Sequence, residues 1–600
     1  MANILNLTEL SYNARRNGFD LSERLATSAK VGEALPIYCV EVIPDDDWKI
    51  ITKHFTRTMP LNTAAFTRVQ EYIDYYFVPT NLLWDKFNTW FMQLNDQNTK
   101  AISINGNASL TEDGPYFSTY QLYSAIYRMS QGNYKNFFGY KRAELACKIL
   151  HHLGYGDFYG ALTEASMPGT AQNANLCPFP LLAYQKVCQD HIRNSQWQNA
   201  YAPSYNINYI SGASGTLNVP LDDMDLSVEG MLDMSYTDWN KDMFMGLLPN
   251  SQFGDMAEVD VESLMSVTSP YSASSSTLIG SSSTNPSPSL QALVLQPNSA
   301  SALYANGNVP SISLSASDTD RLRTALGLSS DSGDLVGSFS ILALRLAESV
   351  QQLKEIRQSR KQDVKDQMKA IWNVSIDKSM SDRSHWIGGS KSVLDISEVV
   401  NQNLADNNAA DIAGKGVGVG QGVVNFRSEI HGYIVGIYHA APLLDYANSG
   451  VDRKCLKTKI TDFANPVLDH TGMVSLPAVE LTNSNTNISL LGKYLGYLPR
   501  YYDYKMSYDK VRGAFYNGGE NLENWVAPIT DSYIKNYIDS LGALGDISII
   551  NYWWMKINPS ILNPIFAQDA DSSVLTDQLL LNIGIDAKAI RNLDRDGLPY

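Results

Sequence analysis

The sequence predicts a mainly β protein in which short strands form a barrel or a sandwich and long insertions connect them. Segments rich in Val, Ile, Tyr and Phe are short and lie far apart in the 600-residue chain, and such side chains favour strands. No repeat of fixed period is visible. Eight strands of typical length would use only about 45 residues, so most of the chain would be insertion.

The composition is typical of a globular chain that buries surface against partners. Aromatic residues make up 10% of the chain, with 34 Tyr and 10 Trp, and side chains with an apolar body and a polar tip suit protein interfaces. The formal charge of −16 excludes a protein whose whole surface grips nucleic acid, because phosphate binding needs a positive face. A local basic patch is still compatible with this charge.

The sequence shows no sign of export or of membrane insertion. The five cysteines are odd in number and include no CxxC pair, which indicates reduced thiols of a cytoplasmic product. The N-terminus lacks a basic start followed by an apolar stretch, and no run of about 18 apolar residues occurs.

The N-terminal part is predicted to hold two strands. A polar stretch, residues 1–35, is expected to be an arm or a short helix. Residues 36–43 form the first predicted strand, which a turn rich in Pro and Asp closes. Residues 71–78 form the second, rich in aromatic and β-branched side chains and ended by Pro79. A helix is predicted to start after Asn81.

The central part is predicted to hold loops, helices and one unusual insertion. Residues 100–175 are expected to be long loops with short helices, and residues 181–200 have helical spacing. The range 263–317 is rich in Ser and aliphatic residues but contains no Asp, Glu, Lys or Arg. We interpret residues 255–335 as a variable insertion that orders by packing on copies of itself, with a flexible linker as the alternative.

A long helix is predicted over residues 338–372, where apolar residues recur at three- and four-residue steps. Residues 341–371 hold seven basic and four acidic side chains, an excess of basic charge in an acidic protein. Residues 430–438 and 552–557 again cluster aromatic and β-branched side chains and are predicted as strands.

Five segments stand out in order along residues 36–560: Glu41–Asp47, Phe77–Asp85, Gly388–Ser390, Glu429–Gly436 and Leu495–Lys505. As an ordered set they resemble the major capsid proteins of microviruses, small icosahedral single-stranded DNA phages, in a lineage like the gokushoviruses and the phages of Bacteroidetes. The family's patterns are E-V-L-P-G-D, F-V-P-x-R-L-L-W-D, G-G-S, E-H-G-Y-I-I-G and F-G-Y-Q-E-R-Y-x-E-Y-R. Here Asp45 replaces Gly, Asn81 replaces Arg and Ile430 is additional, so the first turn is expected to differ in shape.

This resemblance implies one domain over residues 1–600, a single eight-stranded antiparallel jelly roll with long loop and helical insertions. It implies about 60 identical subunits, by icosahedral symmetry, in a T=1 shell around a circular single-stranded DNA genome. The protein would be made in the cytoplasm of a bacterial host and would then form the shell of the virion. Minor virion proteins such as a DNA pilot protein, and a host surface receptor of unknown identity, are the other implied partners. The insertion 255–335 would form a protrusion at the threefold axis.

Nucleic-acid contact is the one site chemistry that the residues suggest. One densely basic stretch and one that interleaves charge with aromatic rings, as single-strand binders do, supply the candidates: Arg453, Lys454, Lys457 and Lys459, and Arg500, Tyr501 and Lys505. A further basic group lies on the predicted long helix. A solvated face or an ion pair between subunits is the favoured explanation for any single cluster.

No catalytic, cofactor or metal site is predicted, and the protein is not expected to be an enzyme. The sequence lacks HExxH, GxSxG and phosphate-loop patterns, and His151 and His152 would point apart on a helix. The alternating glycines of Gly414–Gly422 indicate a mobile or tightly packed strand edge. Two rivals belong to other classes. A secreted glycan-binding protein would need an export signal, and none is seen, whereas a phage glycan-degrading enzyme, which needs two carboxylates in a cleft, stays open.

Overall fold

The chain divides into two compact units, residues 1–253 with 356–600, and residues 254–355. The computed structural model describes residues 16–61, 67–92, 102–104, 108–110, 114–165, 174–213, 216–220, 229–254, 341–361, 364–376, 381–400, 412–469, 471–483, 493–516, 525–538, 550–566 and 577–595. The expected variable insertion, residues 255–335, lies outside these ranges.

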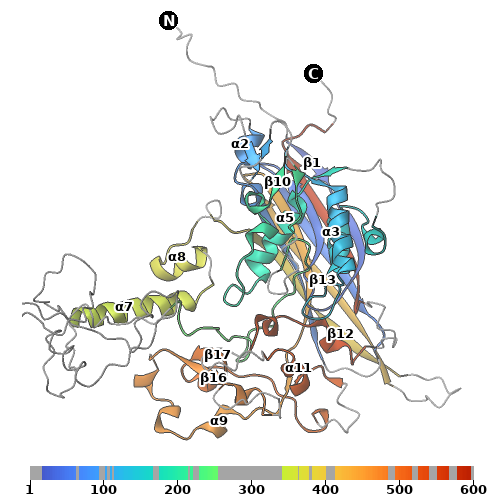
Figure 1. Cartoon of the computed structure of the whole chain (residues 1–600). Helices are drawn as coiled ribbons and strands as arrows, with labels where there is room; N and C mark the ends of the chain where they lie inside the picture. Colours follow the sequence, from blue (N-terminus) through green and yellow to red (C-terminus); the bar gives the residue numbers. More distant parts are fainter. Residues whose placement is uncertain are drawn as a thin grey trace, which may run out of the picture. The chain divides into compact units, whose positions relative to one another are not determined.

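A sheet of nine strands forms the centre of the first unit (Figure 1). Its strands are β1 (Asn17–Asp20), β2 (Glu23–Ala29), β3 (Leu35–Val42), β4 (Asp47–Thr58), β5 (Val69–Pro79), β12 (His385–Val400), β13 (Ile412–Arg427), β14 (Gly432–Pro442) and β19 (Leu579–Arg591). Their order is β1-β19-β4-β13-β12-β5-β14-β3, with β2 also paired to β19. All the pairs are antiparallel. This curled antiparallel sheet confirms the predicted mainly β, jelly-roll fold class.

Three strands predicted from the sequence are confirmed. Residues 36–43, 71–78 and 430–438 correspond to β3, β5 and β14. The arm or short helix expected over residues 1–35 was wrong in part, because residues 17–29 form β1 and β2. These two strands pair with successive stretches of β19, which satisfies backbone groups that a free arm would leave to water.

The turn between β3 and β4 contains the residue that departs from the family pattern. Asp45 has φ of 68°, in the left-handed region that glycine enters most readily and that Asp tolerates better than most residues. The Arg427 guanidinium lies 2.5 Å from its carboxylate. The turn therefore uses a left-handed residue without glycine.

Strand β4 separates a core face from a solvent face. Its residues alternate between exposed or half-buried and buried along the whole strand, as expected when one face of a sheet packs on a core. Trp48 and Ile50 are buried, as are Leu581 and Ile583 on the neighbouring strand β19. The other face of β4 carries its charged side chains.

The glycine-rich run lies in the middle of the sheet. Tight packing there is confirmed, but the predicted edge position was wrong, because β13 lies between β4 and β12. A Cβ at Gly418 would lie 2.1 Å from a carboxylate oxygen of Glu71, and one at Gly420 would lie 2.2 Å from the ring of His54. The core side of β13 therefore has no room for a side chain at these two positions, whereas Val424 further along the strand is buried.

Helices cover part of the core face. The stretch expected to be loops with short helices contains α3 (Thr119–Gln131) and α4 (Arg142–His152). A capping box in which Ser118 and Gln121 bond each other's backbone starts α3. The helix expected at 181–200 is α5 (Phe179–Val187), which contacts β3, β5 and β14 (Figure 1).

The single helix expected over residues 338–372 is two helices, α7 (Ile341–Gln358) and α8 (Val364–Trp372). The side-chain amide of Gln196 donates to the Gln358 carbonyl at 2.9 Å, so a partner from another segment satisfies a carbonyl at the end of α7. Apolar periodicity continues across the break and could not reveal it. Among the helices that the structure describes, none is long and apolar enough to cross a membrane.

The strand predicted over residues 552–557 is wrong. Residues Tyr552–Met555 form a 3₁₀ helix, and Trp553, Trp554 and Met555 are all buried. Three consecutive buried side chains need partners in several directions, which a strand with alternating faces does not provide. The strand was predicted because large aromatic residues favour strands, but this composition alone does not determine the secondary structure.

A buried ion cluster joins the start of β3 to α4 and to the start of β19. Lys148 Nζ lies 2.8 Å from Glu33 and 3.1 Å from Asp577, and Lys30 Nζ lies 3.0 Å from Asp577. The Glu33 side chain has no exposed surface. Two cations and two carboxylates therefore neutralise each other away from water.

The pKa of Asp577 makes this cluster sensitive to acid. Burial alone would raise this pKa, but Lys148 and Lys30 lower it from 3.8 to about 2. A lowered folded-state pKa stabilises the fold above the ordinary value and is lost as the pH falls through the folded value. We expect the wild type to lose about 2 kcal/mol more unfolding free energy than Asp577→Asn between about pH 4 and about pH 2. Urea unfolding of both proteins measures this, and equal losses would contradict it.

Candidate nucleic-acid interface

The candidate residues lie in a long excursion of the chain between β14 and β19. Here β16 (Met473–Pro477) pairs with β17 (Tyr494–Pro499), and the candidates lie on or directly beside α9 (Arg453–Leu456) and α10 (Tyr502–Lys505). We call residues 453–459 and 500–505 together the excursion surface.

The structure brings the two predicted basic stretches together. Lys457 forms an ion pair with Asp503, and its Nζ lies 3.9 Å from the ring centroid of Tyr504. The Arg453 guanidinium lies 6.0 Å from the ring centroid of Tyr502. Residues far apart in the sequence therefore form one surface, as a combined binding site would require.

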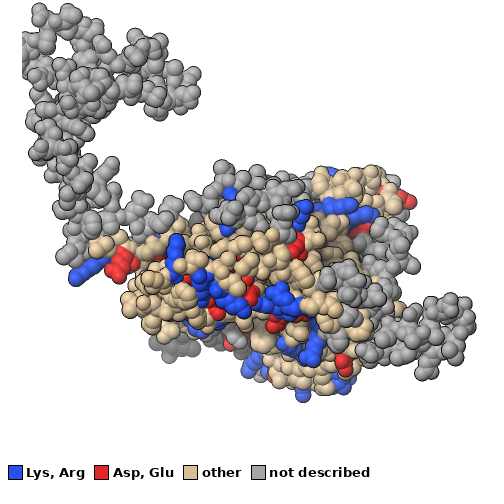
Figure 2. All heavy atoms as spheres, turned by 90° about the horizontal axis from the view of Figure 1, so that it is seen from below, with Lys and Arg blue, Asp and Glu red and all other residues tan. Residues whose placement is uncertain are grey.

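Most cations of the excursion surface are already paired with carboxylates. Arg453 lies 3.6 Å from Glu480 and 3.7 Å from Asp462. Lys505 lies 2.5 Å from Asp469. On the face that Figure 2 shows, basic and acidic side chains are likewise interspersed. Ion pairing within the subunit therefore accounts for these cations without a nucleic acid.

The three other candidate cations are Lys454, Lys459 and Arg500. Lys454 is 77% exposed and lies 3.5 Å from Asp452. Within the described parts of the chain, no carboxylate lies within ion-pair distance of Lys459 or Arg500. Arg500 lies 5.4 Å from the ring centroid of Tyr501. Lys459 and Arg500 are therefore the cations of this surface that can meet a phosphate without losing a carboxylate.

The aromatic candidate is less suited to stacking than its neighbour. Tyr501 is only 8% exposed, whereas Tyr504 is 58% exposed. Tyr504 was not among the predicted candidates. Both rings lie in the same charged and aromatic stretch, and the sequence does not show which of them is exposed. A base could stack on Tyr504 more readily than on Tyr501.

A buried carboxyl group lies beneath this surface. Burial raises the pKa of Glu480 to about 7, against the lowering effects of the Tyr502 hydroxyl and of Arg453. The Tyr502 hydroxyl donates to Glu480 at 2.5 Å. The excursion surface therefore becomes more positive as the pH falls through about 7.

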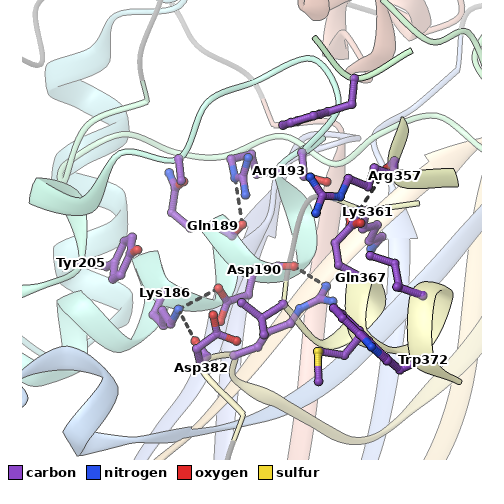
Figure 3. A pocket seen from close by; sticks show the side chains of 17 residues that line it. Lys186, Gln189, Asp190, Arg193, Tyr205, Arg357, Lys361, Gln367, Trp372 and Asp382 are labelled. Carbon is purple, nitrogen blue, oxygen red and sulfur yellow. Dashed lines mark hydrogen bonds and ion pairs between the residues drawn. The ribbon is translucent and has the colours of Figure 1, made fainter. Parts of the chain in front are cut away.

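Arg357 and Lys361, two basic residues from the region predicted as one long helix, line a cavity of about 500 Å³ (Figure 3). Basic side chains come from α5, the chain after it, the helix break and the segment before β12: Lys186, Arg193, Arg357, Lys361 and Arg383. Lys186 Nζ lies 2.9 Å from Asp190 and donates to the Asp382 carbonyl at 2.9 Å. Trp372 gives the cavity an apolar side. The lining suits an anionic ligand better than a cationic one.

A buried histidine and carboxylate pair escaped the sequence reasoning. His54 Nε2 lies 2.8 Å from the Ser392 hydroxyl and 3.6 Å from Glu71. Burial would raise the pKa of Glu71, but hydrogen bonds from His54, Thr56 and Tyr438 lower it. These residues come from separate strands, and their burial in the sheet indicates a structural role.

The adjacent histidines do not form a metal pair. The His152 ring contacts the Thr27 hydroxyl at 2.7 Å and the Lys148 carbonyl at 2.7 Å, and the ring centroids of His151 and His152 are 6.3 Å apart. Over the described ranges, no group of three or more His, Cys, Asp or Glu side chains gathers to hold a metal ion.

Two comparisons with known proteins identify relatives of this chain. The chain matches the model of a family described as capsid protein (F protein) over residues 9–111 and 152–536. The capsid protein VP1 of Chlamydia phage 1 is 22% identical to this chain over an alignment 564 residues long. The match covers 85% of this chain and 86% of that protein. All five segments that resemble microvirus proteins lie within the matched ranges, and the resemblance is confirmed. The chain therefore belongs to the capsid protein (F protein) family of the microviruses.

Proposed function

We propose that the protein is the subunit of a T=1 icosahedral shell that encloses a circular single-stranded DNA genome, and that it has no enzymatic role. The family match over most of the chain carries this proposal. Different edges of each subunit would meet around the symmetry axes, where heterologous contacts close into rings. A glycan-binding or glycan-degrading function is not favoured by the match.

We also propose the partners that such a shell would have. Synthesis takes place in the cytoplasm of a bacterial host, and the finished protein resides in the virion. Minor virion proteins such as a DNA pilot protein accompany it, and surface loops contact a host receptor. The insertion 255–335 remains the proposed threefold protrusion.

An apolar patch on the excursion supports contact between copies. Ile460, Phe463 and Val467 are 94%, 55% and 83% exposed, and we call them the excursion patch. Clustered exposed apolar side chains mark interaction sites. Burying one such side chain contributes about 1.5–3 kcal/mol. We propose that a neighbouring copy of the chain covers this patch.

Nuclease protection tests whether the shell encloses DNA. Purified particles are treated with DNase, disrupted, and their nucleic acid is digested with a nuclease specific for single strands. We expect circular DNA that survives the first enzyme and is cut by the second. Intact particles that contain no protected single-stranded DNA would contradict this part of the proposal.

The same assay tests the excursion surface. We expect Lys459→Gln combined with Arg500→Gln to reduce packaged DNA or particle yield, because two cations without carboxylate partners are lost. Lys505→Gln is the matched control, since Asp469 already neutralises Lys505, and its DNA content should stay near that of the wild type. Unchanged DNA content in the double variant would remove this surface from consideration.

A further inference from the structure

The solvent side of the sheet differs from an ordinary polar surface. On β4, Lys49, Lys53 and Arg57 are exposed, and Ile51 and Phe55 between them are half-buried. We call the solvent side of β4, β13 and β19 the outer sheet face. Cations and apolar groups thus alternate along one strand.

The neighbouring strands widen this pattern. Phe55 pairs with Val419 of β13, and Arg57 pairs with Leu580 of β19. Val419 is 69% exposed and Leu580 is 45% exposed. Successive outward residues of a strand are separated by roughly 7 Å. Apolar side chains of all three strands therefore lie beside the line of cations on β4.

Strand β13 differs between its two faces. Gly418 and Gly420 face the core with no room for a Cβ, and the buried Val424 follows on the same side of the strand. Its outward positions include Val419 and Val423, which are 69% and 51% exposed. Along its glycine-rich stretch the strand therefore presents apolar side chains to solvent and glycines to the core.

Three cations of the outer sheet face, all on β4, lack acidic partners, whereas Arg427 of β13 and Lys588 of β19 are paired with Asp45 and Asp586. Across the residues that the structure describes, no carboxylate lies within ion-pair distance of Lys49, Lys53 or Arg57. The Arg57 guanidinium instead lies 5.0 Å from the ring centroid of Phe55. Arg453, Lys457 and Lys505 on the excursion surface are all paired. Uncompensated cations in a chain of net charge −16 indicate an anionic partner.

We propose that the outer sheet face binds single-stranded DNA, with Lys49, Lys53 and Arg57 on the phosphates and Phe55 and Val419 against the bases. This inference rests on the proposed enclosure of DNA and adds the place of contact. Cations that follow a backbone, beside aromatic and apolar side chains that contact bases, bind single strands with little sequence preference. A second copy of the chain would have to supply carboxylates opposite each cation.

The test uses the purified full-length protein and a fluorescein-labelled single-stranded DNA oligonucleotide of mixed sequence. Affinity is measured by anisotropy over a range of salt concentrations. Each phosphate contact contributes about 0.7 to the slope of log affinity against log salt. Lys49→Gln, Lys53→Gln and Arg57→Gln together should lower that slope by about 2. Phe55→Ala should weaken binding about tenfold through lost stacking.

A charge-retaining variant is the matched control. Lys49→Arg, Lys53→Arg and Arg57→Lys together should keep the wild-type slope. An unchanged slope in the Gln variant would overturn the inference. A Gln variant that binds DNA like the wild type but forms no shells would also overturn it, because the face would then contact another copy.

Lysine footprinting of the wild type keeps the inference testable if the Gln variant does not fold. The oligonucleotide should protect Lys49 and Lys53 from acetylation and leave Lys141, which is 55% exposed, reactive. Unprotected Lys49 and Lys53 in a protein that binds the oligonucleotide would overturn the inference alone. A wild type that neither binds nor packages single-stranded DNA would instead contradict the proposed function.

Discussion

Replacement of Lys148 by Met is expected to lower the unfolding free energy by about 3–5 kcal/mol, because it leaves a buried carboxylate without its cation. Lys148 Nζ lies 2.8 Å from Glu33 and 3.1 Å from Asp577. Without it, Lys30 alone would face both carboxylates, at 3.0 Å from Asp577 and 3.9 Å from Glu33. Urea unfolding followed by tryptophan fluorescence measures the loss.

Lys141→Met is the matched control for this prediction. Lys141 precedes the same helix, is 55% exposed and lies 2.9 Å from Glu144. Exposed pairs of this kind contribute at most about 1 kcal/mol, so this variant should unfold almost like the wild type. A Lys148→Met protein as stable as Lys141→Met would show that the buried cluster does not stabilise the fold.

Charged substitutions in the excursion patch are expected to prevent shell formation without unfolding the subunit. Ile460 and Val467 are 94% and 83% exposed, so Ile460→Asp or Val467→Asp costs the isolated subunit little. At a contact between copies, each removes about 3 kcal/mol of apolar burial. A loss of that size raises the subunit concentration needed for assembly more than about a hundredfold.

Sedimentation of wild-type and variant proteins at matched concentrations measures this effect. Ile460→Val keeps an apolar side chain and should assemble like the wild type. Circular dichroism should show the same fold for all variants. Normal particles from Ile460→Asp and Val467→Asp would mean that no neighbouring copy covers the excursion patch.

The sequence predicted parts of the fold where local signals and tertiary packing agree. Strands β3, β5 and β14 were found because their β-branched and aromatic residues also pack in the sheet. The segment 552–557 has the same composition, yet Trp553 and Trp554 are buried on a 3₁₀ helix. At the break between α7 and α8 the Gln358 carbonyl accepts a hydrogen bond from Gln196, a residue of another segment, and no local pattern shows this contact.

The candidate site was also predicted only in part, because contacts between distant segments determine which of its charges are paired. Charge density identified Arg453 and Lys457, but their carboxylate partners come from elsewhere in the chain, such as Glu480 and Asp503. The outer sheet face was missed because its cations are separated by other residues along β4. Its apolar row also joins strands far apart in the sequence. Strand register, which only the structure gives, brings these residues together.

The central claim is that this chain reaches its full burial only beside identical copies in a closed shell. Electron cryomicroscopy of particles purified from infected or expressing cells tests it most directly, because it shows both the copy number and the contacts of each subunit. We expect about 60 copies per particle, as icosahedral symmetry requires, with the excursion patch buried against a neighbour. A protein that stays monomeric under all conditions, with the excursion patch exposed, would contradict the claim.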